Sequence, residues 1–226
     1  MTDGLPLFPL GTVLFPGLVL PLQVFEERYR ALVRDLVAQP DGSPREFGVV
    51  AIQRGWEVDH HAGTSASLTL HEVGCTAQIR QVTEHPDGRF DLVTVGHRRF
   101  SIADIDSTTQ PYLVARVDWL DEPEGRTGEA DRLTPGVLEL FQRYLRLIRP
   151  DQAGEQLPED PTVLSHLVAA TAALALADRQ ALLASPDTAT RLRAERAMLG
   201  REVALLRRVR AVPVPLADLA VSTSPN

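Results

Sequence analysis

The sequence predicts an α+β protein with a β-rich front half and a helical back half. Short apolar segments separated by turn residues follow one another up to Leu120, as expected of a small, mostly antiparallel sheet or barrel. At Asp121 the composition changes to acidic residues and glycine, which is typical of a linker. Beyond the linker, apolar residues repeat at helical spacing, and prolines stand where helices begin.

In the front half, Gly11–Leu22 is rich in Val, Leu and Phe, and its prolines indicate edge or irregular strands. A helix is expected next, because apolar residues recur at helical spacing from Val24 to Leu36. The segment Pro86-Asp87-Gly88 predicts a tight hairpin turn. The remaining predicted strands are Phe47–Ile52, Leu68–Val82, Phe90–Val95, Arg99–Ile105 and Tyr112–Leu120.

These patterns divide the chain into a β-rich subdomain (residues 1–120), an acidic linker (121–134), a helical bundle (135–210) and a proline-containing, partly disordered tail (211–226). In the bundle, a capping side chain precedes a proline at the three predicted helix starts, Thr134-Pro135, Asp160-Pro161 and Ser185-Pro186. A short helix around Arg179–Leu183 leads into the last one, Pro186–Arg210. That last helix carries seven arginines against three acids, and we expect them on a solvated face.

Composition excludes several kinds of function. The net charge of −7 argues against nucleic acid or an anionic membrane as the main partner. All 23 basic residues are arginine, so no Schiff-base lysine, Ser-Lys dyad or P-loop lysine can form. Prolines interrupt the first apolar run, which therefore predicts neither a signal peptide nor a membrane span. With Cys75 as its single cysteine, the chain has no internal disulfide, and we expect a cytoplasmic protein.

No catalytic constellation is evident. The sequence has no G-x-S-x-G motif, and the acid pair Asp121-Glu122 falls in the linker, where we expect nothing to desolvate it. Cys75 lies in an apolar strand and is expected to be a buried structural thiol. The metal-type side chains that cluster in sequence are His60, His61, His71 and Glu72. They have no cysteine partner within the cluster, so we predict no metal site, no cofactor and no enzymatic activity.

Several blocks then occur in a characteristic order: LPLFPLGTVLFPGLVLPLQVFEERYRALVRDL (Leu5–Leu36), FGVVAI (Phe47–Ile52), LHEVGCTAQIRQVTEHPDGRFDLVTVGHRRFSI (Leu70–Ile102) and YLVARVDWL (Tyr112–Leu120). Together with the helical segments after them, they closely resemble the N-terminal domain of Lon proteases, over roughly Leu5–Val209. The resemblance implies a PUA-like small β-barrel with one helix, followed by a helical bundle. It also implies a role in recognising unfolded or tagged substrates. Because Lon proteases continue into an ATPase and a Ser-Lys protease, we expect a solitary domain without either.

The leading hypothesis is a non-catalytic module that binds unfolded or extended polypeptide, as an adaptor presenting clients to a separate protease or chaperone. The alternatives are an RNA-binding PUA-like protein, and small-molecule binding or hydrolysis in the cleft between the two halves. We expect a monomer or a weak homodimer. A proline-broken strand edge can accept an extended peptide by strand addition. The candidate binding residues, in a groove between barrel and bundle, are Phe15, Pro16, Trp56, Arg98, Arg99 and Tyr112.

Overall fold

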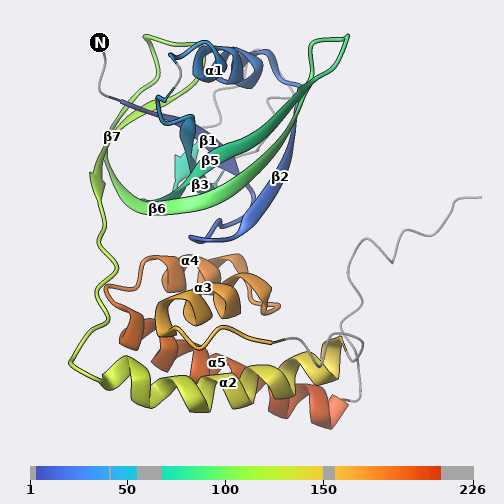
Figure 1. The fold of residues 1–226 in the computed structure, drawn as a ribbon, viewed down its shortest axis with the longest axis vertical. Helices are drawn as coiled ribbons and strands as arrows, with labels where there is room; N and C mark the ends of the chain where they lie inside the picture. Colours follow the sequence, from blue (N-terminus) through green and yellow to red (C-terminus); the bar gives the residue numbers. More distant parts are fainter. Residues whose placement is uncertain (1–3, 41, 55–67, 150–155, 210–226) are drawn as a thin grey trace, which may run out of the picture.

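The computed structural model describes residues 4–40, 42–54, 68–149 and 156–209, with a sheet above a group of helices (Figure 1). The strands are β1 (Leu5–Leu10), β2 (Val19–Val24), β3 (Glu46–Arg54), β4 (Thr69–Leu70), β5 (Val73–Glu84), β6 (Phe90–Asp106) and β7 (Val114–Trp119). The helices are α1 (Glu27–Val37), α2 (Glu129–Ile148), α3 (Pro161–Thr171), α4 (Leu176–Leu183) and α5 (Thr188–Val209). The predicted α+β class is confirmed.

The strand pairings run in a closed path through β1, β7, β6, β5 and β3, because β3 pairs with β1 again. The β1–β3 pair is parallel and the other pairs are antiparallel, so the predicted, mostly antiparallel sheet is confirmed. Strand β2 lies outside this path, and among the described strands it pairs only with β6. The PUA-like architecture and the division into subdomains stay predictions.

The hairpin between β5 and β6 forms at the predicted turn, where Gly88 has a left-handed φ of 79° that favours glycine. In β6, Phe90, Leu92 and Thr94 are buried, and the residues between them are more exposed. This alternation is typical of a strand with one buried face, and the predicted strand Phe90–Val95 lies within β6.

Three strand boundaries differ from the prediction. Segments Phe90–Val95 and Arg99–Ile105 belong to one strand, β6, while Leu68–Val82 is divided between β4 and β5. The predicted strand Gly11–Leu22 is also wrong in part, because β1 ends at Leu10 and the chain forms a loop before β2. Pairing explains the length of β6: its first part is hydrogen-bonded to β2 and β5 and its second part to β5 and β7.

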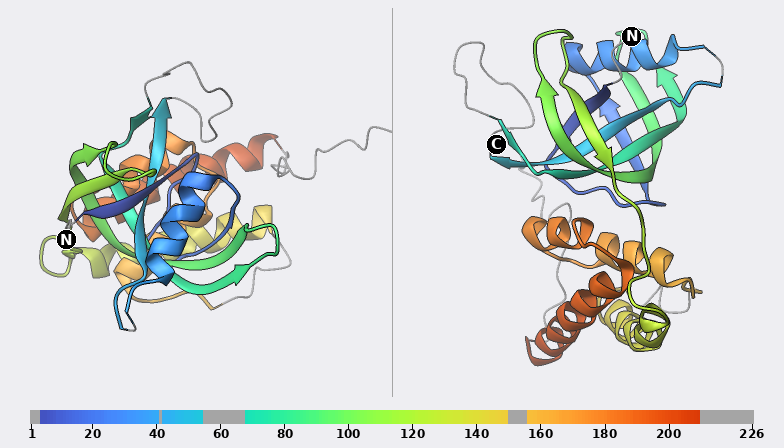
Figure 2. Two further views of the ribbon diagram at one scale, coloured as in Figure 1. Left: turned by 90° about the horizontal axis from the view of Figure 1, so that it is seen from above. Right: turned by 90° about the vertical axis from the view of Figure 1, so that its left-hand side faces the viewer.

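The main apolar core fills the space inside the sheet and extends into the helices. Helix α1 covers one end of the sheet, and α3 and α4 lie beneath the other end (Figures 1 and 2). Accordingly, this core contains residues of α3 and α4, namely Ala169, Leu182 and Leu183, alongside those of the strands and α1. A second core forms among the helices themselves, around Phe141, Tyr144 and Leu192. The sheet therefore depends on the helices to keep one of its ends from water.

Of the three predicted helix starts, the one at α3 agrees with the structure and those at α2 and α5 differ from it. At α3 the prediction is confirmed, because the Asp160 side chain accepts a hydrogen bond from the Val163 amide at 2.8 Å. Helix α2 begins at Glu129 rather than Pro135, because the acids assigned to the linker form its first turn, where the helix dipole favours them. At α5 the capping side chain is Asp187, which accepts from the Thr190 amide at 2.7 Å, rather than Ser185. Within the described ranges, no helix has both the length and the apolar character needed to cross a bilayer.

Gly96 allows the closest approach between the sheet and the loop before β2. Its amide donates to Leu18 O and its carbonyl accepts from the Gly17 amide, both at 2.8 Å. A Cβ at Gly96 would lie 2.1 Å from the carbonyl oxygen of Phe15, so the loop would have to move. We expect Gly96→Ala to lower the free energy of unfolding by about 2–3 kcal/mol in urea denaturation.

The matched control is Gly200→Ala in α5, where a new Cβ would meet nothing within 4 Å. Since alanine is the better helix former, we expect a gain of about 0.5–1 kcal/mol. Equal effects of the two substitutions would contradict the assigned contact.

Candidate functional site

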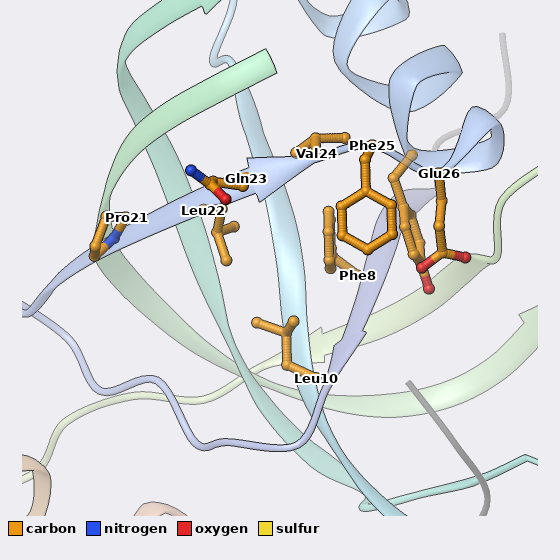
Figure 3. A pocket seen from close by; sticks show the side chains of 9 residues that line it. Phe8, Leu10, Pro21, Leu22, Gln23, Val24, Phe25 and Glu26 are labelled. Atoms are coloured by element: carbon orange, nitrogen blue, oxygen red, sulfur yellow. The ribbon is translucent and has the colours of Figure 1, made fainter. Parts of the chain in front are cut away.

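An apolar cavity of about 210 Å³ lies between β1 and β2 (Figure 3). Its lining residues are Phe8, Leu10, Pro21, Leu22, Gln23, Val24, Phe25, Glu26 and Tyr29. They come from β1, from consecutive positions of β2 and the turn after it, and from the start of α1. Strand β6 contributes none of them, so the cavity lies on the side of β2 that β6 does not cover.

Aromatic rings form the deeper wall and the rim of the cavity. The rings of Phe8 and Tyr29 stack with their centroids 4.1 Å apart. Figure 3 shows Leu22 and Leu10 pointing toward each other from the two strands, with the ring of Phe25 beside Phe8. Phe25 is 54% exposed, although large aromatic side chains are usually covered. The cavity therefore opens to the surface beside an exposed aromatic ring.

The charge at the rim of the cavity is balanced. Glu26 forms an ion pair with Arg28 at 2.9 Å, and the Arg28 guanidinium also lies over the Tyr29 ring, 4.6 Å from its centroid. An arginine in this position contributes a cation–π interaction and covers one face of the ring. The cavity is thus bordered by a neutral pair rather than by a net charge.

The structure does not bring together the five predicted binding residues that it describes. Phe15 is fully buried and lies against His166 of α3, with ring centroids 6.1 Å apart, while Pro16 beside it is partly exposed. Tyr112 is also buried, and its hydroxyl donates to Asp35 of α1 at 2.6 Å, so it packs against a different helix from Phe15. Burial and the neighbouring Asp35 carboxylate raise the pKa of Tyr112.

Of the remaining three predicted residues, Arg98 and Arg99 are described by the structure. Arg98 is exposed and lies over the ring of Trp119, 4.3 Å from its centroid. Trp56 lies outside the described residues, as do His60 and His61. Arg99, next to Arg98 in sequence, points the opposite way and is 2% exposed, because successive residues of a strand face opposite sides.

Arg99 joins the sheet to the helices instead of facing a ligand. Its guanidinium donates to the carbonyl oxygens of Leu183 at 2.7 Å, Ser185 at 2.8 Å and Asp121 at 2.8 Å. It also forms a short ion pair with Glu122. Nε and both terminal nitrogens of Arg99 thus donate to acceptors within the protein, and the side chain is not directed at a ligand.

Glu122 is the centre of a buried charged cluster, contrary to the expectation that the linker acids are solvated. Arg191 of α5 donates to its Oε2 at 3.2 Å, and His166 Nε2 lies 3.4 Å from the same oxygen. Burial alone would raise the pKa of Glu122, but the contact with His166 and the charges of Arg191 and Arg99 lower it to about 2. Arg191 is fully buried, so the expectation of a solvated face is wrong for this arginine.

Glu195 lies one turn after Arg191 on α5 and is fully buried. Among the described residues, neither of its carboxylate oxygens has a hydrogen-bond partner. Burial raises its pKa well above the ordinary value, against the lowering effect of Arg191. The pKa values of the two acids next to Arg191 are therefore shifted in opposite directions, downward for Glu122 and upward for Glu195.

The predicted structural thiol is confirmed. Cys75 is fully buried, and burial raises its pKa to about 12, so it is not a nucleophile at neutral pH. Over the ranges that the structure describes, no three His, Cys, Asp or Glu side chains are grouped as a metal ion would require.

Sequence reasoning missed Phe25 and Glu122. The helical spacing predicts that Val24 and Phe25 both belong to a helix, but Val24 ends strand β2. Consecutive residues at a strand end point to opposite sides, so one of these two bulky apolar neighbours must be exposed. That adjacency was the available signal for Phe25. Glu122 offered none, because its partners Arg99, His166 and Arg191 are distant in sequence.

The fold and the cavity together define an α+β domain with an apolar cavity at a strand edge. Residues 4–201 match the model of one protein family, described as the substrate-binding domain of ATP-dependent protease La (Lon). The chain therefore belongs to the Lon substrate-binding domain family, and the resemblance drawn from its sequence blocks is confirmed.

Curated relatives extend over most of this chain but are much longer than it. It is 31% identical over 210 residues to Lon protease 2 of Herpetosiphon aurantiacus, a match that covers 91% of this chain and 24% of that protein. It is 28% identical over 207 residues to Lon protease 1 of Thermus thermophilus, covering 88% of this chain and 25% of the relative. The chain thus spans about a quarter of the length of these proteases.

Solved structures of similar domains have the same fold. The Lon N-terminal domain protein from Xanthomonas campestris has a TM-score of 0.55 and 26% identity, covering 84% of this chain and 95% of that one. The N-terminal domain of the Mycobacterium avium complex Lon protease has a TM-score of 0.62 at 22% identity, covering 89% and 98%. The second likeness concerns the fold alone.

The lowered pKa of Glu122 makes a testable contribution to stability. Its ordinary pKa is 4.5 and its folded value about 2, so the contribution is present above pH 4.5 and is lost as the pH falls toward 2. We expect Glu122→Gln to lower the free energy of unfolding by about 2–4 kcal/mol at neutral pH, because two buried guanidinium groups lose their anion. Denaturation at several pH values should show a flatter acid limb for the variant.

Glu139→Gln is the control, because Glu139 is an exposed partner of Arg143 on α2. An exposed pair of this kind contributes little, so we expect a change within about 0.5 kcal/mol. Equal effects at Glu122 and Glu139 would show that the buried cluster does not stabilise the fold.

Glu195 should show the opposite pH dependence. Unfolded Glu195 ionises near its ordinary pKa, whereas the folded group keeps its proton to higher pH, so stability is lost as the pH rises through this interval. We expect Glu195→Gln to be more stable than the parent protein at about pH 8, with a smaller difference at about pH 4. A difference between the two proteins that stays constant with pH would contradict the buried, protonated state.

Proposed function

We propose that this chain is a recognition module for unfolded or extended polypeptides, and that it contacts them at the cavity between β1 and β2. The observation that carries the proposal is the exposed Phe25 ring beside an apolar cavity, in a domain of the Lon substrate-binding family. Aromatic anchors next to apolar pockets often dominate the free energy of protein interfaces. An unfolded chain exposes the apolar side chains that such a pocket accepts.

The size of the cavity supports a side chain as its occupant. Sites for small molecules usually measure about 300–1,000 Å³. At about 210 Å³, this cavity is smaller than that range and is suited to a single large side chain. The alternative of small-molecule binding or hydrolysis is therefore less well supported, and no observation favours the RNA-binding alternative.

The wider role follows from the same proposal. We propose a non-catalytic adaptor in the cytoplasm that delivers bound clients to a separate protease or chaperone. The two Lon proteases named above are about four times as long as this chain, which supports a link to proteolysis. A monomer or weak homodimer fits this role, because a client site at one strand edge needs no second copy.

The proposal predicts that a charge at Phe25 strongly weakens the binding of unfolded polypeptide. The probe is a reduced, carboxymethylated and fluorescently labelled protein that cannot fold, titrated in fluorescence anisotropy. We expect Phe25→Asp to weaken its binding by about thirtyfold or more, as for an interface anchor, because the carboxylate would have to be desolvated in an apolar site. Stability should change little, since the side chain is 54% exposed.

Val163→Asp is the matched control, because Val163 on α3 is also 54% exposed and lies away from the cavity. It should bind the probe like the parent protein. If the parent protein does not bind the probe, or if both variants lose binding equally, the proposed function is wrong.

A further inference from the structure

We infer that the bound polypeptide is an added β-strand, paired with the free edge of β2, with one apolar side chain in the cavity. The inference rests on the proposed function and specifies how the client is held. Its occupant is an extended segment with apolar side chains at alternate positions. The edge of β2, rather than the loop at Phe15 and Pro16 expected from the sequence, is the surface that receives it.

The direction of the backbone groups in β2 is fixed by the contacts on its paired side. Leu18 O accepts from the Gly96 amide and Leu20 O from Thr94 Oγ1, both at 2.8 Å, so these residues face β6. Backbone groups of alternate residues in a strand point to opposite edges. The backbone groups of Val19, Pro21 and Gln23 therefore point away from β6. They lie along the edge of β2 that is not hydrogen-bonded to any other described strand.

Pro21 agrees with this assignment and leaves the edge usable. A proline is tolerated in a strand where its missing amide would face outward, because no ladder hydrogen bond is lost. The edge still offers the amides of Val19 and Gln23 and the carbonyl groups of all three outward-facing residues. An extended peptide backbone supplies the complementary donors and acceptors at the same spacing.

The cavity lies next to this edge, where a side chain of the added strand would enter it. Consecutive residues from Pro21 to Glu26 line one side of the cavity, and Phe8 and Leu10 of β1 line the other. Residues Phe8–Leu10 of β1 pair with β3 on one edge. On the other edge, only Leu5 and Pro6 of β1 are paired with β7 in the described structure. The space between β1 and β2 is thus bordered by strands that do not pair with each other.

A second copy of this chain fits the edge less well than a client segment. Antiparallel pairing of two β2 edges about Pro21 would place the Pro21 residues of the two copies opposite each other. Proline has no backbone N–H, so neither Pro21 carbonyl group would receive a hydrogen bond. Each copy also carries a net charge of −7, which opposes association. A client segment has neither disadvantage.

The test is an N-methyl scan of a labelled probe peptide, in which threonine and valine alternate around a central phenylalanine and arginines stand at both ends. N-methylation removes one backbone donor and adds bulk at that edge of the strand. In an added strand, methyl groups at alternate positions face β2 and should weaken binding by about threefold to tenfold each. Methyl groups at the positions between them should leave the affinity unchanged.

A variant of the protein tests the same contact from the other side. Gln23→Pro removes an outward-facing amide and leaves the even-numbered contacts with β6 intact, so it should fold like the parent protein in thermal denaturation. It should bind the unmethylated peptide about threefold to tenfold more weakly. Gln23→Ala, which keeps the amide, is the control and should bind normally.

The outcomes separate the inference from the proposed function. Binding that depends on Phe25 but falls equally, or not at all, at every methylated position overturns strand addition and leaves polypeptide recognition standing. Parent protein that binds neither this peptide nor the unfolded protein overturns both. A third outcome would also overturn the inference. In it, the protein does not bind the peptide but self-associates in sedimentation experiments, and Gln23→Pro abolishes this self-association.

Discussion

The buried guanidinium of Arg99 determines how the two halves of this protein are joined. It starts on β6 and ends among carbonyl oxygens at the end of α4 and beside the Glu122 carboxylate. A guanidinium is stable in the interior only when its donors are paired, because an unpaired buried charge costs several kcal/mol. The planar group also fixes the directions of its acceptors. The helices must therefore hold one orientation beneath the sheet for Arg99 to be satisfied.

The charges around Arg99 show how one environment gives two carboxyl groups different states. Glu122 meets two guanidinium groups and His166, so its ionised form is favoured despite partial burial. Glu195 is near Arg191 as well, but burial dominates there and its protonated form is favoured. Direct hydrogen bonds to the charged form separate the two cases. Arg99 and Arg191 share the Glu122 carboxylate and also donate to other groups of this chain, which agrees with a structural role.

The charged cluster and the candidate site lie at different places on the sheet. The charged cluster closes the end of the sheet that meets α3 and α4, whereas the cavity lies between β1 and β2 near the start of α1 (Figures 1 and 3). Strand β2 is held by β6 alone, so its outer edge stays free of internal partners in the described chain. Long exposed edges invite aggregation, and Pro21 limits that risk while leaving Val19 and Gln23 able to pair.

The sequence by itself determined the class of fold, most of the elements and the family. Alternating residues in β6, the turn at Gly88 and the cap at Asp160 depend on neighbours along the chain, so local pattern was enough to predict them. Ordered motifs covering most of the chain were enough for the family. A local pattern was not enough for Glu129 and Asp131. Acidic residues occur both in solvated linkers and in the first turn of a helix, and the structure places these two in the first turn of α2.

Only the tertiary structure decided which residues form the candidate site. Phe15 and Phe25 are both aromatic residues near prolines, but the first is buried against α3 and the second is 54% exposed. Arg98 and Arg99 are adjacent and chemically identical, and the pleat of β6 sends one to the surface and the other into the interior. Exposure and charge pairing depend on segments that are distant in sequence, and those contacts exist only after the sheet and helices have packed together.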